Sequence, residues 1–132
     1  MEEIHRVLRD DGFFVLIESI PPDEESMKYW KEILELKDMG RHKSFYLTKA
    51  QLEEFIACKF NIVSARILKQ RIFLKQWLDN CVRSIDRDRK RYIYQKIISL
   101  PTFIKERYEF SGSDIDDMTF SRIAYVLIAK KK

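Results

Sequence analysis

The chain has 132 residues, of which 45% are hydrophobic and 35% are charged, and its formal net charge is +4 at pH 7. This length suffices for one domain with its own core, and the composition is typical of a globular protein rather than a disordered one. No apolar run reaches the roughly 18 to 20 residues of a membrane span, and the start of the sequence lacks an apolar signal core. Because Cys58 and Cys81 stand alone, without CxxC spacing or neighbouring histidines, we expect a cytoplasmic protein with reduced thiols and no membrane partner.

The chain opens with a helix, a turn and an apolar strand. Apolar residues at helical spacing predict a helix over residues 2–9. The turn at residues 10–12 follows, with Gly12 expected to take the positive φ that ends a helix. The run FFVLI at 13–17 is apolar at every position, which predicts a strand covered on both faces, as in a parallel sheet between helices.

Two further helices are predicted before the next strand. An apolar stripe predicts a helix from Asp23 to about Met39, and residues 40–46 are expected to form a loop. Thr48 followed by Gln51 matches a capping box, so a helix is predicted from there to about Cys58.

The second half ends in an interior strand. Residues from Asn61 to about Leu74 are β-rich with mixed polarity, which predicts an outer strand. Apolar positions from Val82 to Ile97 indicate a longer helix, and a short helix is expected from Pro101 to about Tyr108. Residues 111–117 are expected to be a loop, and the apolar run after Thr119 predicts the interior strand. This order of elements indicates a single α/β domain.

The basic residues do not indicate a nucleic-acid site. RDRKR at 87–91 interleaves acids with bases, and further lysines stand at 130–132. A nucleic-acid binder usually concentrates its positive charge on one face, so we expect a solvated helix face here. The alternative, nucleic-acid binding that weakens steeply with salt, ranks last.

The segment EIHRVLRDDGFFVLIESIPP, residues 3–22, resembles a stretch of the class I S-adenosylmethionine-dependent methyltransferases, in particular the quinone-biosynthesis and related small-molecule enzymes. Their pattern is a helix that ends in an Arg-Val-Leu-Lys-Pro-Gly-Gly-like turn before an apolar strand, the fifth of the fold. The matching residues are Arg6, Val7, Leu8, Arg9 and Gly12, whereas Asp10 and Asp11 replace the proline and the first glycine. Residues 48–66 are similar to the next helix and the sixth strand, and residues 121–131 to the seventh strand.

The resemblance implies an α/β fold that is the C-terminal part of a Rossmann-like methyltransferase, with three strands and flanking helices. In the family the last strand runs antiparallel between the other two, and the first of these three lies beside a fourth strand. Residues 1–132 are thus expected to form one partial domain that lacks the N-terminal cofactor-binding half. Without the fourth strand the edge at 13–19 is uncovered, so the expected partner is a second copy or a complementing N-terminal half.

The same resemblance places the cofactor outside this chain. In the family a glycine-rich loop and an acidic residue in the preceding half hold S-adenosylmethionine, whereas Gly12, Gly40 and Gly112 are isolated here. We therefore expect S-adenosylmethionine in the complete enzyme and none bound by this chain alone. The expected function is the substrate side of a small-molecule methyltransferase, inactive alone. The alternative is a non-enzymatic interaction or complementing module derived from a methyltransferase.

Three candidate substrate-pocket residues end the first strand. Ligands of open α/β sheets bind beyond the carboxyl ends of strands, which selects Glu18, Ser19 and Ile20. Glu18 is suited to orient or deprotonate a methyl acceptor. The alternative is that Glu18 is a solvated strand end or pairs with an arginine.

Three further candidates lie in segments expected to cover the acceptor. His42 is suited to act as a base near neutral pH, although a lone loop histidine is more often simply exposed. Tyr46 and Trp77 have the apolar body and polar tip of pocket residues, with helix packing as the alternative. The histidines and cysteines show no metal-ligand spacing.

Overall fold

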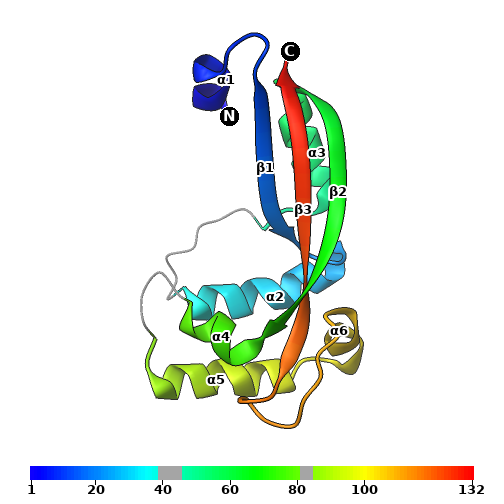
Figure 1. Cartoon of the computed structure of the whole chain (residues 1–132). Helices are drawn as coiled ribbons and strands as arrows, with labels where there is room; N and C mark the ends of the chain where they lie inside the picture. Colours follow the sequence, from blue (N-terminus) through cyan, green and yellow to red (C-terminus); the bar gives the residue numbers. More distant parts are fainter. Residues whose placement is uncertain (39–45, 81–84) are drawn as a thin grey trace.

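The computed structural model describes residues 1–38, 46–80 and 85–132. Six helices and three strands occur in these ranges, and Figure 1 shows a tall sheet with most of the helices gathered around its lower end. In chain order they are α1 (Glu2–Val7), β1 (Phe13–Ile20), α2 (Glu24–Lys37), α3 (Lys49–Ala57), β2 (Phe60–Phe73), α4 (Leu74–Asp79), α5 (Arg87–Ile98), α6 (Thr102–Arg107) and β3 (Thr119–Lys131). The predicted order of helices and strands is found, except that α4 between β2 and α5 was not predicted. Within the described ranges no helix is both long and apolar enough to cross a membrane.

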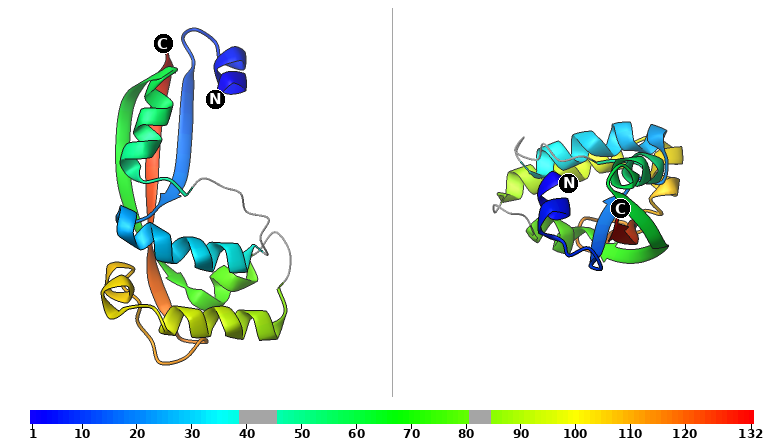
Figure 2. Two further views of the ribbon diagram at one scale, coloured as in Figure 1. Left: turned by 180° about the vertical axis from the view of Figure 1, so that it is seen from behind. Right: turned by 90° about the horizontal axis from the view of Figure 1, so that it is seen from above.

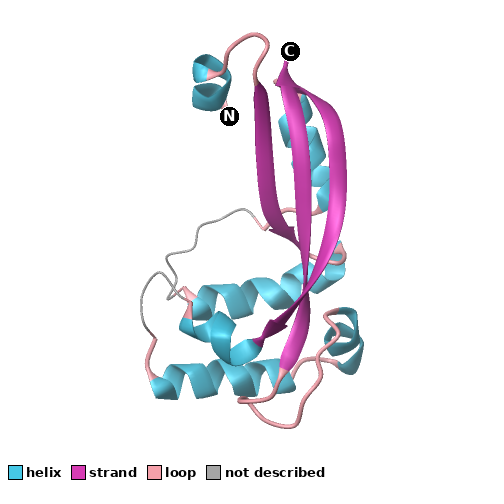
Figure 3. Ribbon diagram, in the orientation of Figure 1, coloured by secondary structure: helices cyan, strands magenta, loops and turns pink. Residues whose placement is uncertain are grey.

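The strands form one sheet in the order β1-β3-β2, visible in Figure 3. β3 runs antiparallel to both neighbours, so that Val126 lies opposite Ile17 of β1 and Arg66 of β2. A register shift between Ile62 and Ser64 marks a bulge in β2. The α/β class and the predicted placement of the last strand between the other two are both confirmed.

Two apolar cores hold the fold together. The lower core joins α2, α4, α5 and α6 to the start of β3, and its buried residues are Trp30, Ile33, Leu74, Leu78, Ile85, Ile93, Ile97, Ile104, Tyr108, Met118 and Phe120. The upper core joins α3 to one face of the sheet, with Ile20, Leu52, Ile56, Phe60, Tyr125, Leu127 and Ala129 buried. The predicted capping box starts α3, because Thr48 accepts from the Gln51 N–H at 3.3 Å and the Gln51 side chain accepts from the Thr48 N–H at 3.0 Å.

The expectation that β1 is covered on both faces is wrong for this chain. Phe14 and Leu16 pack against the upper core, and Figure 2 shows α3 lying over that side of the sheet. On the opposite face Phe13, Val15 and Ile17 are 57%, 56% and 67% exposed. We call these three residues the open face of β1. The apolar run therefore indicated a strand correctly, but on one face its side chains are more than half exposed.

Two local expectations are also corrected. Gly12 has no positive φ; a Cβ there would come within 3.0 Å of Leu8 Cδ1 and 3.1 Å of the Arg9 carbonyl oxygen, so the residue permits a close approach instead. The longer helix expected from Val82 is α5, which begins at Arg87 after Asp86, whose carboxylate accepts from the Arg89 N–H at 2.8 Å. Val82 lies outside the described residues, and α4 was not predicted.

Candidate functional site

A cavity of about 270 Å³ lies where the carboxyl end of β1 meets α2, α4 and β3. Its lining residues are Glu18, Ser19, Ile20, Trp30, Leu34, Lys37, Asp38, Tyr46, Trp77, Asn80, Tyr108, Phe120, Ser121, Arg122 and Ile123. Five of the six predicted site residues are among them, although they come from three separate segments. The sixth, His42, lies outside the described residues.

Stacked aromatic rings form one wall of this cavity. Trp30 is 4% exposed, and its ring centroid lies 4.6 Å from that of Tyr108 at an interplanar angle of 24°. The ring centroid of Trp77 lies 5.5 Å from that of Trp30, at an interplanar angle of 30°. Phe120 contacts both tryptophans with centroid distances of 5.5 Å. Trp77 thus packs and lines the cavity at once, so the two interpretations of this residue do not exclude each other.

Two tyrosine hydroxyls meet inside the wall. The hydroxyls of Tyr46 and Tyr108 are 3.2 Å apart, and they connect segments separated by 62 positions. Burial raises the pKa of both phenols well above the ordinary value, because it disfavours the charged form. Both groups are therefore neutral at physiological pH, and each has hydrogen-bonding capacity beyond this one contact.

Charged groups stand at the rim of the cavity. Glu18 is exposed, its carboxylate accepts from the Ser19 N–H at 3.2 Å, and it forms no ion pair with any residue that the structure describes. The alternative of a Glu18–arginine pair is therefore not found, whereas the solvated strand end remains open. The Lys37 ammonium lies 4.6 Å from the Trp77 ring centroid, which places a cation beside the aromatic wall.

Arg122 is a charged lining residue that the sequence did not single out. Its Nη2 donates to the Gln70 side-chain oxygen at 2.6 Å, while its Nε is buried without a hydrogen-bond partner among the described residues. A buried, unpaired donor is costly, so the cavity is suited to a ligand with an acceptor group near this atom. The signal available in the sequence was a charged residue directly before the apolar run at 123–129.

The two glycines that the structure describes, Gly12 and Gly112, leave no space for S-adenosylmethionine. Glycines that hold a cofactor leave space for its close approach, but a Cβ at Gly12 would meet Leu8, and a Cβ at Gly112 would come within 2.6 Å of Met118 Cα. Both glycines therefore serve contacts within the chain itself. Among the described residues there is also no group of three or more His, Cys, Asp or Glu side chains that is able to hold a metal ion.

Comparisons with known proteins identify the fold. No family model matches the sequence, and no curated protein matches it. BH2331 from Bacillus halodurans C-125, described as a candidate methyltransferase, superimposes with a TM-score of 0.81 and 17% identity over 98% of this chain and 60% of that chain. YcgJ from Bacillus subtilis superimposes with a TM-score of 0.75 and 15% identity over 98% of this chain and 55% of that one. The chain thus spans a little over half the length of each protein, and its three-stranded sheet with flanking helices matches part of a methyltransferase-like structure.

Proposed function

We propose that this chain supplies the acceptor-binding part of a small-molecule methyltransferase that uses S-adenosylmethionine, and that it is inactive until a cofactor-binding part joins it. The observation that carries the proposal is the cavity at the carboxyl end of β1, where Glu18 stands beside the aromatic wall formed by Trp30 and Trp77. The fold shared with BH2331 supports it.

The cavity suggests a small, flat acceptor. Stacked rings favour a planar apolar body, and the volume of about 270 Å³ lies just below the usual range for ligand pockets. Arg122 Nε is placed to donate to an anionic or acceptor substituent, and Glu18 to orient the acceptor's hydroxyl or amine or to take its proton. Because positioning supplies much of the acceleration in such transfers, the wall itself contributes by holding the acceptor and excluding water.

The cofactor-binding part would dock along β1. The outer edge of β1 pairs with no strand in the described chain, and its open face is apolar. An apolar hollow of about 420 Å³ also adjoins this strand, lined by Met1, Leu16, Glu18, Leu47, Gln51, Leu52, Phe55 and Ile56. An unpaired apolar edge favours association with another chain, so in isolation a second copy is the expected partner, and in the complete enzyme the cofactor-binding part.

Isothermal titration with S-adenosylmethionine tests whether the cofactor site lies outside this chain. The chain alone is expected to show no binding in the micromolar range, because no described glycine leaves room for the cofactor. Micromolar binding by the isolated chain would contradict the proposal that the cofactor site belongs to another part.

Tryptophan fluorescence tests the acceptor cavity directly. The chain has two tryptophans, and both line this cavity, so a bound ring compound must change the emission. With para-hydroxybenzoate as the probe we expect saturable quenching, and Arg122→Gln is expected to weaken binding about tenfold, as for the loss of a charged hydrogen bond. Arg66→Gln, on the exposed part of β2, is the charge-matched control. Equal affinities of both variants for the probe would show that Arg122 does not contact it. Absence of quenching would contradict the proposal that the cavity binds a planar ring compound.

A second candidate function is a non-enzymatic module that completes another chain. The open face of β1 favours it, because docking needs only this surface and not the cavity. Combining this chain with a cofactor-binding chain distinguishes the two functions, because both assembly and methyl transfer can then be measured. For an enzyme, Glu18→Gln lowers methyl transfer and leaves assembly intact, whereas a module forms the complex with no transfer that depends on Glu18.

A further inference from the structure

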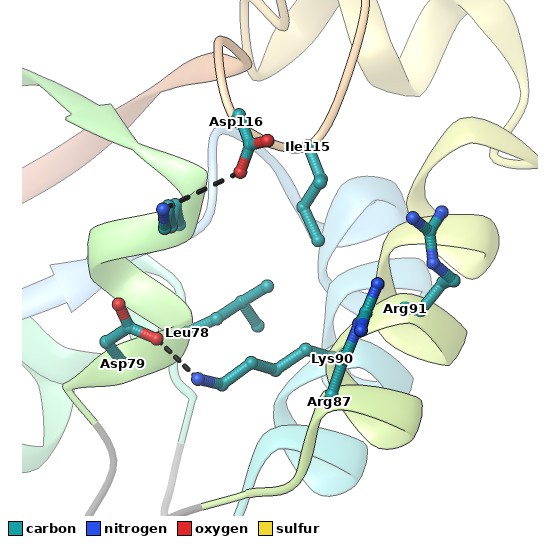
Figure 4. Close-up of a pocket in the computed structure, with 8 residues that line it drawn as sticks. Leu78, Asp79, Arg87, Lys90, Arg91, Ile115 and Asp116 are labelled. Carbon is teal, nitrogen blue, oxygen red and sulfur yellow. Dashed lines mark hydrogen bonds and ion pairs between the residues drawn. The ribbon is translucent and has the colours of Figure 1, made fainter.

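A second hollow lies away from the acceptor cavity and shares no residue with it. It has a volume of about 270 Å³ and is bordered by α4, α5 and the loop before β3, as Figure 4 shows. Its lining residues are Lys75, Leu78, Asp79, Arg87, Lys90, Arg91, Ile115 and Asp116. Leu78 is buried and Ile115 points into the space between the charged groups (Figure 4), so the hollow has apolar walls and a charged rim.

The charges of this hollow do not balance. Each of its two carboxylates is taken by a lysine: Asp79 lies 2.5 Å from the Lys90 ammonium and Asp116 lies 3.7 Å from that of Lys75. No described carboxylate is within ion-pair distance of Arg87 or Arg91, and residues 39–45 and 81–84 include no Asp or Glu. Four cations against two carboxylates leave a surplus of two positive charges, and the two guanidinium groups carry it.

The positions of these arginines work against the helix that holds them. Arg87 and Arg91 are one turn apart on α5, and like charges at this spacing destabilise a helix. Arg87 also occupies the first turn, where the helix dipole favours negative groups. Asp86 is engaged with the Arg89 N–H, and Asp88 forms no ion pair with any described residue. An anion between the two guanidinium groups would relieve both unfavourable terms.

We propose that this hollow binds a phosphate-type anion, namely the phosphate or diphosphate group of a small molecule, between Arg87 and Arg91. Guanidinium groups match phosphate oxygens with paired hydrogen bonds, and the hollow has room for one or two phosphate groups. Lys75 and Lys90 also line the hollow, each beside its carboxylate, while the walls of Leu78 and Ile115 suit the adjoining apolar carbon of the ligand. The site is separate from methyl transfer and does not depend on the proposed function.

Titration of the ¹⁵N-labelled chain with inorganic diphosphate, with ionic strength held constant by chloride, tests the site by NMR. Saturable shifts are expected in the amides of α4, the first turns of α5 and residues 111–117. Arg91→Gln should weaken binding about tenfold, as for one charged hydrogen bond, and Arg87→Gln similarly. Arg66→Gln, an exposed arginine on β2, removes the same charge elsewhere and should leave affinity within about twofold.

Three results would overturn the proposal. Equal losses for Arg91→Gln and Arg66→Gln would show that diphosphate responds only to net charge. Shifts spread over the surface without saturation would show that no built site exists. Binding of a single-stranded oligonucleotide that strengthens with its length, with no saturation by diphosphate, would point to a nucleic-acid surface instead.

Discussion

The lower core, with helices α2, α4, α5 and α6 around it (the lower layer), and the sheet above it (the upper sheet) differ in how completely they bury their apolar residues. In the lower layer four helices enclose the start of β3, and Ile93, Ile97 and Ile104 are fully buried. In the upper sheet α3 covers one face, while Val15 and Ile17 on the other are more than half exposed. The same residue type thus stabilises the chain in one region and contributes little in the other, since burial removes apolar surface from water only where a second layer exists.

The largest expected effect comes from truncating isoleucines in the two regions. Ile93→Ala should lower the free energy of unfolding by about 2–5 kcal/mol because it leaves a cavity in the lower core. Ile17→Ala, the same change on the open face, should cost about 0.5 kcal/mol or less, as for most surface positions. Urea unfolding at a low protein concentration measures both. Similar costs for the two variants would contradict the contrast between the regions.

The next effect concerns association through the open face. We expect the isolated chain to form a homodimer at tens of micromolar, because β1 offers an apolar face and an unpaired edge. Ile17→Lys should convert this dimer to a monomer in sedimentation velocity, because the docked state would bury an unpaired charge. Phe73→Lys is a control, since Phe73 is also exposed but ends β2 on the other edge. A wild-type chain that sediments as a monomer would refute the dimer.

Much of the fold follows from local signals, and the departures have physical causes. Thr48 with Gln51 and the three apolar or β-rich runs each indicated an element that the structure contains. The helix α4 was missed because it has six residues and follows β2 directly, without a breaker or a side-chain cap. Asp86 was an available signal for the start of α5, since Asp is a preferred N-cap. The uncovered edge of β1 was expected, but its exposed face was not, because an apolar run does not show which of its two faces another layer covers.

The candidate site shows a similar limit. Glu18, Ser19 and Ile20 were selected by a rule on strand ends, and the cavity brings them together with Tyr46 and Trp77. The Tyr46–Tyr108 hydroxyl contact joins residues 62 positions apart, and no local pattern encodes such a pair. Long-range contacts of this kind depend on how α6 packs against the segment before α3, which the sequence does not state.

A smaller effect is expected at Asp23, which belongs to the lower layer. Its carboxylate accepts from the Ser26 N–H at 2.7 Å and from Arg107 at 3.2 Å. Burial raises its pKa, but these hydrogen bonds and the arginine charge outweigh that and hold the pKa below the ordinary value. Asp23→Ala should cost about 1 kcal/mol near neutral pH for the lost cap, measured by thermal or urea unfolding.

The pH dependence of this contact has a definite sign. Because the folded-state pKa of Asp23 is lowered, its stabilisation is present above the unfolded value, about 3.9, and is lost as pH falls through the folded value. Asp23→Asn keeps a good N-cap while it removes the charge, so this control should cost less than Asp23→Ala at neutral pH. Both variants should flatten the acid limb of the stability curve below about pH 4. An unchanged acid limb would show that the contacts of Asp23 with Arg107 and the Ser26 N–H do not contribute to the pH dependence of stability.

The last comparison takes one tyrosine hydroxyl from each region. In the upper core Tyr125 donates to the Glu53 carboxylate at 2.5 Å, whereas the Tyr46–Tyr108 contact near the lower core joins two neutral groups at 3.2 Å. Hydrogen bonds to charged groups are worth more than neutral ones, so Tyr125→Phe should lower the free energy of unfolding by about 1 kcal/mol and Tyr46→Phe by less. Burial, together with the hydrogen bond and charge of Glu53, raises the pKa of Tyr125. Its stabilisation is therefore present below the unfolded value of about 10 and is lost as pH rises beyond it. Urea unfolding between neutral pH and about pH 11 should show a flatter alkaline limb of the stability curve for Tyr125→Phe than for the wild type. A larger loss of unfolding free energy for Tyr46→Phe than for Tyr125→Phe would contradict the prediction that the hydrogen bond to the charged group is the stronger one.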